Sequence, residues 1–176
     1  MSQPPAKKSE RIVFVTVGTT LFEALIDAMT QKSVLERLAK LGYTLMIVQY
    51  GKGAVPKLGP DEKLPLRVQV YDFQTTLAAD MQRADLIIGH AGAGTVSEVL
   101  GYGKRLVVVI NTALMHNHQT ELGHAMRDRH HLYVVEEPQR LLQDSTWEAI
   151  EQFKAVPLPA GDPYDFPNLL DRFLAT

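Results

Sequence analysis

The sequence predicts an α/β protein with a doubly wound, mainly parallel sheet. Short apolar runs alternate with segments of helical periodicity along most of the chain, which is the pattern of successive βα units. Glycine-rich turns directly follow two of these runs, as the βα loops of such sheets do. The 176 residues suit one domain with a sizeable core, and 45% apolar and 22% charged residues are ordinary for a globular protein.

The expected strands are apolar or alternating runs of strand length. They occupy residues 12–17, 44–49, 66–70, 86–88, 105–110 and 132–135. Between the second and third runs, residues 51–65 carry repeated glycine and proline and predict a loop.

The expected helices carry apolar residues at helical spacing. They occupy residues 21–29, with the apolar stripe continuing through 34–41, then 77–84, a segment beginning near Thr95, 117–129 and 145–153. Gly42 ends its stripe as a C′ residue, and Ser145 with Glu148 has capping-box spacing.

Composition excludes several classes of function. A net charge of -2 disfavours a general nucleic-acid binder, and the absence of cysteine excludes disulfides and thiolate metal sites. Residues 1–10 form a polar lead-in with no signal-peptide core, and no apolar run approaches the roughly 20 residues that span a bilayer. No Asp-x-Asp occurs, so no metal-bridged nucleotide-sugar site is indicated.

Two glycine-rich turns, at residues 18–20 and 90–95, follow expected strands. They are either tight βα turns or cradles for an anionic group, because a helix N-terminus carries free N–H groups. Neither is a P-loop, since no Gly-Lys-Ser/Thr follows. A dinucleotide site is disfavoured, because the second strand ends at Gln49 without an acidic residue for a ribose. The hypothesis carried forward is a phosphate site for a nucleotide derivative.

Two further polar groups stay ambiguous from spacing alone. Glu98 stands three residues after Thr95, so its carboxylate either completes a capping box or accepts the hydroxyls of a ribose. Residues 117–121 open an expected helix, either as a solvated first turn or as hydrogen-bonding groups for a sugar.

Several motifs occur in order over roughly residues 11–135: FVTVGTT at 14–20, HAGAGT at 90–95 with Glu98, LVVVIN at 106–111, and NHQ at 117–119 with Glu121. Together they resemble the small soluble subunit of the two-component UDP-N-acetylglucosamine transferase of dolichol-linked N-glycan assembly. That subunit is similar to the C-terminal half of the bacterial glycosyltransferase that makes lipid II.

The resemblance implies a Rossmann-like fold forming a single GT-B half-domain, over residues 11–155, that binds UDP-N-acetylglucosamine. It implies a membrane-anchored partner subunit that holds the lipid-linked sugar acceptor. N-acetylglucosamine would be transferred with inversion onto N-acetylglucosaminyl-diphospho-dolichol at the cytosolic face of the endoplasmic reticulum. The implied chain is cytoplasmic, with no metal or other cofactor, no nucleic-acid partner and no membrane insertion of its own. Residues 156–176, a proline-rich connection and an amphipathic helix, would cap the core or dock onto the partner.

The resemblance also assigns site residues motif by motif. These are Gly18, Thr19, Gly92, Ala93, Gly94 and Thr95 for the diphosphate, Glu98 for the ribose, Phe73 for the uracil, and Asn117, Gln119 and Glu121 for the sugar. Thr120 departs from the bacterial pattern, which has a second glutamine there. His90 is the one candidate general base on this chain, but the resemblance implies that the base lies on the acceptor half-domain. We therefore expect a chain that binds donor and is inactive alone.

Besides an unspecified Rossmann-like binding protein, two other functions remain open at this point. One is a bacterial-type exopolysaccharide transferase pair that uses glucose or galactose and shares the same loops. The other is a non-catalytic nucleotide-sugar-binding module that regulates a partner.

Overall fold

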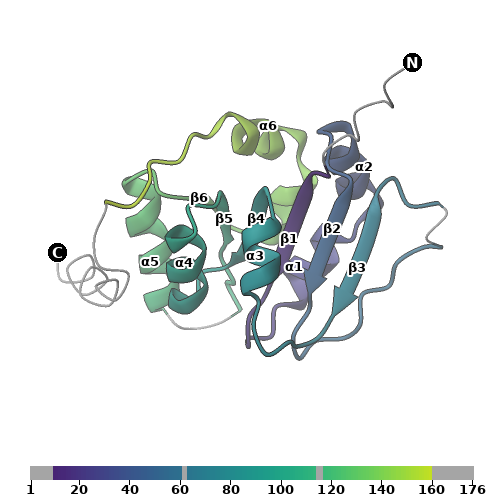
Figure 1. Cartoon of the computed structure of the whole chain (residues 1–176), viewed down its shortest axis with the longest axis horizontal. Helices are drawn as coiled ribbons and strands as arrows, with labels where there is room; N and C mark the ends of the chain where they lie inside the picture. The colour runs from purple at the N-terminus through teal and green to yellow at the C-terminus, as the bar shows by residue number, and fades with distance from the viewer. Residues whose placement is uncertain (1–9, 61–62, 114–116, 160–176) are drawn as a thin grey trace, which may run out of the picture.

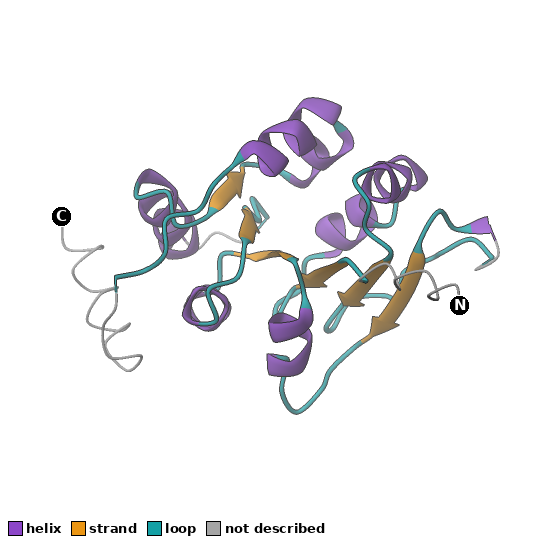
Figure 2. Ribbon diagram, turned by 45° about the horizontal axis from the view of Figure 1, so that its top comes forward, coloured by secondary structure: helices purple, strands orange, loops and turns teal. Residues whose placement is uncertain are grey.

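The computed structural model describes residues 10–60, 63–113 and 117–159, and these confirm the doubly wound fold. Within them the sheet has six strands, all parallel, in the order β3-β2-β1-β4-β5-β6. The strands lie side by side with helices on both sides (Figure 1, Figure 2). They are β1 (Ile12–Thr16), β2 (Leu45–Gln49), β3 (Arg67–Tyr71), β4 (Leu86–His90), β5 (Leu106–Val109) and β6 (Tyr133–Val135).

Alternate residues of each central strand face two apolar layers, because successive side chains of a strand point to opposite faces. Val13 and Val15 pack with the helices of one layer, and Phe14 packs with those of the other. The first layer contains α1 (Glu23–Met29), α2 (Lys32–Lys40), η2 (Pro138–Leu142) and α6 (Asp144–Gln152). The second contains α3 (Ala78–Arg83), α4 (Ala93–Gly101) and α5 (Asn117–Asp128).

The apolar stripe expected to run from residue 21 to 41 is divided into α1 and α2. Thr30 ends α1, and its hydroxyl donates to the Ile26 carbonyl at 2.8 Å, a side-chain bond that competes with continuing the helix. Gly42 is the expected C′ residue, with φ of +89°. The N–H groups of Gly42 and Tyr43 donate back to Ala39 and Leu38, which is the Schellman arrangement.

One other sequence expectation is wrong in detail, and one short helix was not expected. The capping box at Ser145 does not form, because α6 begins at Asp144 and no side chain bonds its first turn. The unexpected helix, η2, supplies the Leu141 carbonyl that accepts the buried Trp147 indole N–H at 2.7 Å.

No helix in the described part of the chain is long and apolar enough to cross a membrane. The amphipathic helix expected near the end of residues 156–176, over residues 168–174, lies outside the described residues.

An ionic cluster joins α6 to the amino ends of three strands. The Glu151 carboxylate accepts hydrogen bonds from Arg11 Nη2 at 3.0 Å and from the Tyr43 hydroxyl at 3.1 Å. Arg105 Nη1 lies 3.7 Å from the same carboxylate, and the Arg11 guanidinium stacks 4.1 Å from the centre of the Tyr43 ring. Since the Glu151 side chain is only 23% exposed, these charge-assisted bonds are partly shielded from water.

We predict that Glu151→Ala lowers the free energy of unfolding by about 1–2 kcal/mol, because it leaves Arg11 and Tyr43 without their shared acceptor. This corresponds to a fall in Tm of roughly 3–6 °C, measurable by circular dichroism. Glu148→Ala, at an exposed position of the same helix, is the matched control. Equal melting temperatures for the two variants would contradict the prediction.

Candidate functional site

The candidate site lies at the carboxyl ends of β1 and β4, where the strand order reverses. From β1 the chain moves outward through β2 to β3, then crosses back to β4 on the other side of β1. The helices after β1 and β4 therefore pack on opposite faces, and their connecting loops diverge. Such switch points leave the crevice in which open α/β sheets bind ligands. Both glycine turns singled out in the sequence lie here.

The second turn is the N-terminus of α4. Gly92 is the N-cap, so the helix begins two residues earlier than expected, at Ala93. The N–H groups of Gly92, Ala93, Gly94 and Thr95 are therefore the four that a helix leaves without intrahelical partners. The first intrahelical bond runs from the Val96 N–H to the Gly92 carbonyl at 2.9 Å. A Cβ added to Gly94 would meet nothing within 4 Å, so this backbone is open to close approach by an anion.

The His90 ring lies between Gly18 of the first turn and Gly92 of the second. A Cβ added to Gly18 would lie 2.8 Å from His90 Cε1, and one added to Gly92 would lie 2.2 Å from His90 Nε2. Glycine is therefore required on both sides of the imidazole ring. The ring is 5% exposed, its Nδ1 is buried without a hydrogen-bond partner, and burial lowers its pKa. His90 is consequently neutral near pH 7, and its ring sets the separation between the two turns. A catalytic role for His90 stays a prediction.

The first turn is held from its other side by the end of β2. Gly18 has φ of +59°, and Gly51 also has a positive φ. A Cβ on Gly51 would lie 2.9 Å from Val17 Cγ2 and 3.3 Å from the Gly18 carbonyl oxygen. The buried Gln49 side chain also hydrogen-bonds this turn. Sequence reasoning missed this function of Gln49, although a lone amide in the apolar run 44–49 was a signal that could have found it.

Glu98 does not cap α4. Thr95 is the third residue of the helix, not the N-cap, and no side chain caps its first turn, so the capping-box interpretation is wrong. The Glu98 carboxylate is exposed, and its Oε1 accepts from the Tyr102 hydroxyl at 3.2 Å. Because residues four apart share a helix face, Glu98 lies one turn beyond the open backbone of Gly94. The carboxylate is therefore on the helix that begins at the second glycine turn, on a face open to solvent.

The structure brings some of the other expected residues to the same edge. Phe73 follows the carboxyl end of β3 and is 47% exposed, so its ring is available to a ligand. Gln119 and Glu121 lie in the first turns of α5, half-buried and exposed respectively. Asn117 begins that helix, but its side chain lies outside the described residues. Asn111, after β5, donates from Nδ2 to the Leu21 carbonyl at 3.2 Å and so joins the β5 loop to the β1 loop.

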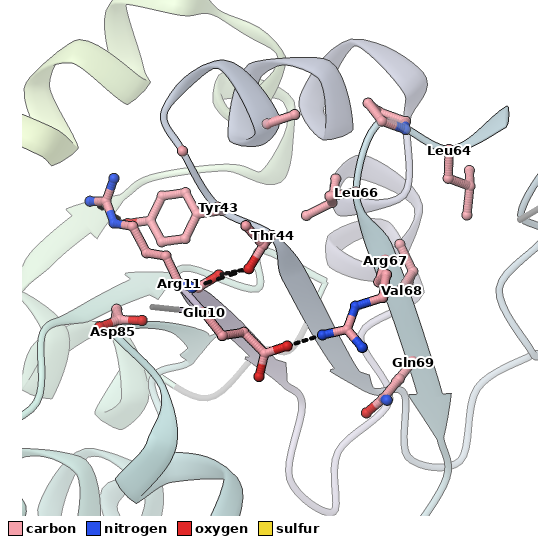
Figure 3. A pocket seen from close by; sticks show the side chains of 13 residues that line it. Glu10, Arg11, Tyr43, Thr44, Leu64, Leu66, Arg67, Val68, Gln69 and Asp85 are labelled. Carbon is pink, nitrogen blue, oxygen red and sulfur yellow. Dashed lines mark hydrogen bonds and ion pairs between the residues drawn. The ribbon is translucent and has the colours of Figure 1, made fainter. Parts of the chain in front are cut away.

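An open cavity of about 1120 Å³ lies at the opposite edge, beside the amino ends of β1, β2 and β3 (Figure 3). Arg11 covers the Tyr43 ring there, and Glu10 forms an ion pair with Arg67 (Figure 3). The cavity has none of the site residues that the sequence predicted. Within the described ranges, no group of three or more His, Cys, Asp or Glu side chains could hold a metal ion.

The sequence was compared with protein families and with known proteins. Residues 12–150 match the family model described as the glycosyltransferase family 28 C-terminal domain. The chain is 45% identical over 124 residues to a human protein named UDP-N-acetylglucosamine transferase subunit ALG13. That alignment covers 70% of this chain but 11% of the human protein, so the chain spans about a tenth of that relative's length.

Solved structures show the same fold. An NMR structure of ALG13 matches with a TM-score of 0.69 and 22% identity, covering 95% of this chain and 98% of that one. A crystal structure of MurG from Acinetobacter baumannii matches with a TM-score of 0.63 and 21% identity, covering 97% of this chain but 51% of MurG. The described fold is therefore that of one GT-B half-domain.

We predict that Gly92→Ala and Gly94→Ala have opposite effects on stability. Gly92→Ala forces His90 out of place and lowers the free energy of unfolding by about 1–3 kcal/mol. Gly94→Ala meets open space and raises it by up to about 1 kcal/mol, because alanine is the better helix former. Urea denaturation measures both values.

If the contact with His90 causes the loss, adding His90→Ala to Gly92→Ala recovers part of it. Similar stabilities for the two glycine variants would contradict the proposed packing.

Proposed function

Since the chain belongs to the glycosyltransferase family 28 C-terminal domain family, we propose that it binds the UDP-N-acetylglucosamine donor of a heteromeric glycosyltransferase. The observation that carries this proposal is the pair of glycine turns at the β1–β4 switch point. The second of these turns is the N-terminus of α4, whose backbone is open to solvent. Free N–H groups and the helix dipole together favour a diphosphate there.

The diphosphate lies on the N–H groups of Gly92, Ala93, Gly94 and Thr95. On the facing turn, Thr19 makes the direct contact, because the Gly18 N–H already donates to Thr16 Oγ1 and Gln49 Oε1. Gly18 contributes its shape, since a side chain at this position would collide with His90.

Glu98 accepts the two ribose hydroxyls, supported by its position one turn beyond Gly94. The uracil lies at the segment after β3, against Phe73 and the neighbouring backbone. Adjacent strands lie about 4.8 Å apart, so this segment is about 10 Å from the turn after β1, a span that a nucleoside diphosphate bridges.

The transferred sugar lies toward α5, where Asn117, Gln119 and Glu121 bind its hydroxyl groups. This helix follows β5, the neighbour of β4, so its first turn lies beside the diphosphate position. Thr120, in place of the second glutamine of the bacterial pattern, changes one of the sugar contacts.

The reaction is transfer of N-acetylglucosamine with inversion onto N-acetylglucosaminyl-diphospho-dolichol. Negative charge grows on the departing UDP as the bond to the anomeric carbon breaks, and the N–H groups at the start of α4 stabilise it without a metal. A membrane-anchored partner supplies the acceptor site and the general base, at the cytosolic face of the endoplasmic reticulum. Residues 156–176 either cap the core or dock onto that partner. The Val156 N–H donates to the His130 carbonyl at 2.8 Å, which supports the first alternative for the start of this segment.

We predict that the chain binds UDP-N-acetylglucosamine and that Glu98→Ala weakens binding at least tenfold, about 1.4 kcal/mol, through loss of the ribose contacts. Isothermal titration calorimetry with UDP-N-acetylglucosamine, UDP-glucose and NAD measures this. Glu36→Ala, an exposed position on α2, is the control for lost charge. Equal affinity for UDP-glucose would favour a glucosyl transferase pair, and absence of UDP-dependent binding would refute the donor site.

We predict that the purified chain alone transfers no sugar and that adding the membrane subunit restores transfer, since the general base is supplied from outside the chain. The measurement is conversion of a short lipid-diphosphate-linked N-acetylglucosamine acceptor. Gln119→Ala should lower the rate of the complex, whereas a regulatory module would show no change. Turnover by the isolated chain at the rate of the complex would contradict the prediction.

A further inference from the structure

Gln49 is a buried polar side chain at the carboxyl edge whose amide oxygen and nitrogen both have hydrogen-bond partners. It is the last residue of β2 and is 1% exposed, among strand residues that are otherwise apolar. Burial of an amide is tolerated only where its hydrogen-bonding groups find partners. The partners of this amide come from the strands on both sides of β2.

The amide oxygen of Gln49 accepts from the β1 end of the site. Its donors are the Thr16 hydroxyl at 2.6 Å, the Gly18 N–H at 2.9 Å and the Val17 N–H at 3.2 Å. The amide nitrogen donates to two carbonyl oxygens, that of Gly18 at 2.9 Å and that of Asp72 at 2.8 Å. One side chain thus joins the turn after β1 to the segment after β3.

These bonds also set the direction of two peptide groups. In a trans peptide the C=O and the following N–H point in opposite directions, and no cis peptide occurs in the described residues. Because Gln49 holds the Gly18 carbonyl inward, the Thr19 N–H points away from Gln49. The Asp72 carbonyl is held in the same way, so the Phe73 N–H also lies on the side away from Gln49, where it contacts Asp72 Oδ1 at 2.7 Å.

We propose that Gln49 is a positioning residue for the donor nucleotide, holding the Thr19 N–H toward the diphosphate and the Asp72–Phe73 segment toward the base. This inference rests on the proposed function, and it identifies the residue that sets the separation between the two ends of the nucleotide site. Only an amide can do this, because it offers an acceptor to β1 and two donors to the carbonyl oxygens. A carboxylate would face both carbonyls with no donor. An apolar side chain would leave the Thr16 hydroxyl without this acceptor and the Gly18 and Asp72 carbonyl oxygens without this donor.

The test compares the UDP dissociation constants of the wild-type chain, Gln49→Glu and Gln49→Met by calorimetry at pH 8. Both variants should bind UDP at least tenfold more weakly, because the two peptide groups lose the bonds that orient them. Gln69→Glu, the same change at an exposed residue of β3, is the matched control and should bind UDP as the wild type does.

Two further readouts separate positioning from a purely structural role. The deficit of Gln49→Glu should shrink as the pH falls from 8 to 6, relative to wild type at each pH. A buried carboxyl that faces two carbonyl oxygens holds its proton more tightly, and the protonated form regains one donor. In ¹⁵N-labelled wild-type protein, UDP should shift the Thr19 amide resonance, and this shift should be lost in Gln49→Met.

A UDP dissociation constant within twofold of wild type in a folded Gln49 variant would overturn the inference and leave the donor site intact. If neither Gln49 variant folds, Thr16→Val decides, because it removes one donor to the amide oxygen; unchanged UDP affinity in that variant would overturn the inference. Failure of the wild-type chain to bind UDP would refute the proposed function itself, and the inference with it.

Discussion

The constraint on which the site depends is the reversal of strand order between β1 and β4. Parallel strands bring all their carboxyl ends to one edge, and at this junction the helices that follow β1 and β4 pack on opposite faces of the sheet. The space opened there exposes the first N–H groups of α4. In the proposed donor site the diphosphate lies at these N–H groups, the base lies on the β2–β3 side of them, and the sugar lies on the β5 side.

Buried polar side chains hold the turns that border this space. His90 lies between Gly18 and Gly92, and Gln49 bonds the turn after β1 from the other side. Both side chains are buried, so they act by holding the solvent-exposed backbone of the turns in place. A site that binds a charged ligand through backbone N–H groups needs such support, because a peptide group cannot turn toward a ligand by changing rotamer. The local requirement for glycine at residues 18 and 92 follows from the size of the imidazole ring.

The two edges of the sheet have different properties. At the amino edge, Arg11, Tyr43 and Glu151 bond one another and attach α6 to the strands, so the charges there are paired within the chain. At the carboxyl edge, the N-terminus of α4, the Glu98 carboxylate and the Phe73 ring face solvent. The fold of this chain corresponds to about half of the MurG structure. In the open cavity at the amino edge, Glu10 pairs with Arg67 and Arg11 pairs with Glu151, so these charges stabilise contacts within the chain.

The sequence by itself determined the class of fold, the order of strands and helices along the chain, and the two glycine turns, because hydrophobic periodicity and glycine placement are local properties. It located α4 to within two residues, but it could not choose between a cap and a ligand contact for Glu98, since that choice depends on which residue is the N-cap. Tertiary structure alone decided that β4 lies beside β1, that His90 fits between Gly18 and Gly92, and that Gln49 reaches both β1 and β3. Those contacts join residues that are distant in sequence, and their geometry is set by strand order and side-chain packing, which no local pattern records.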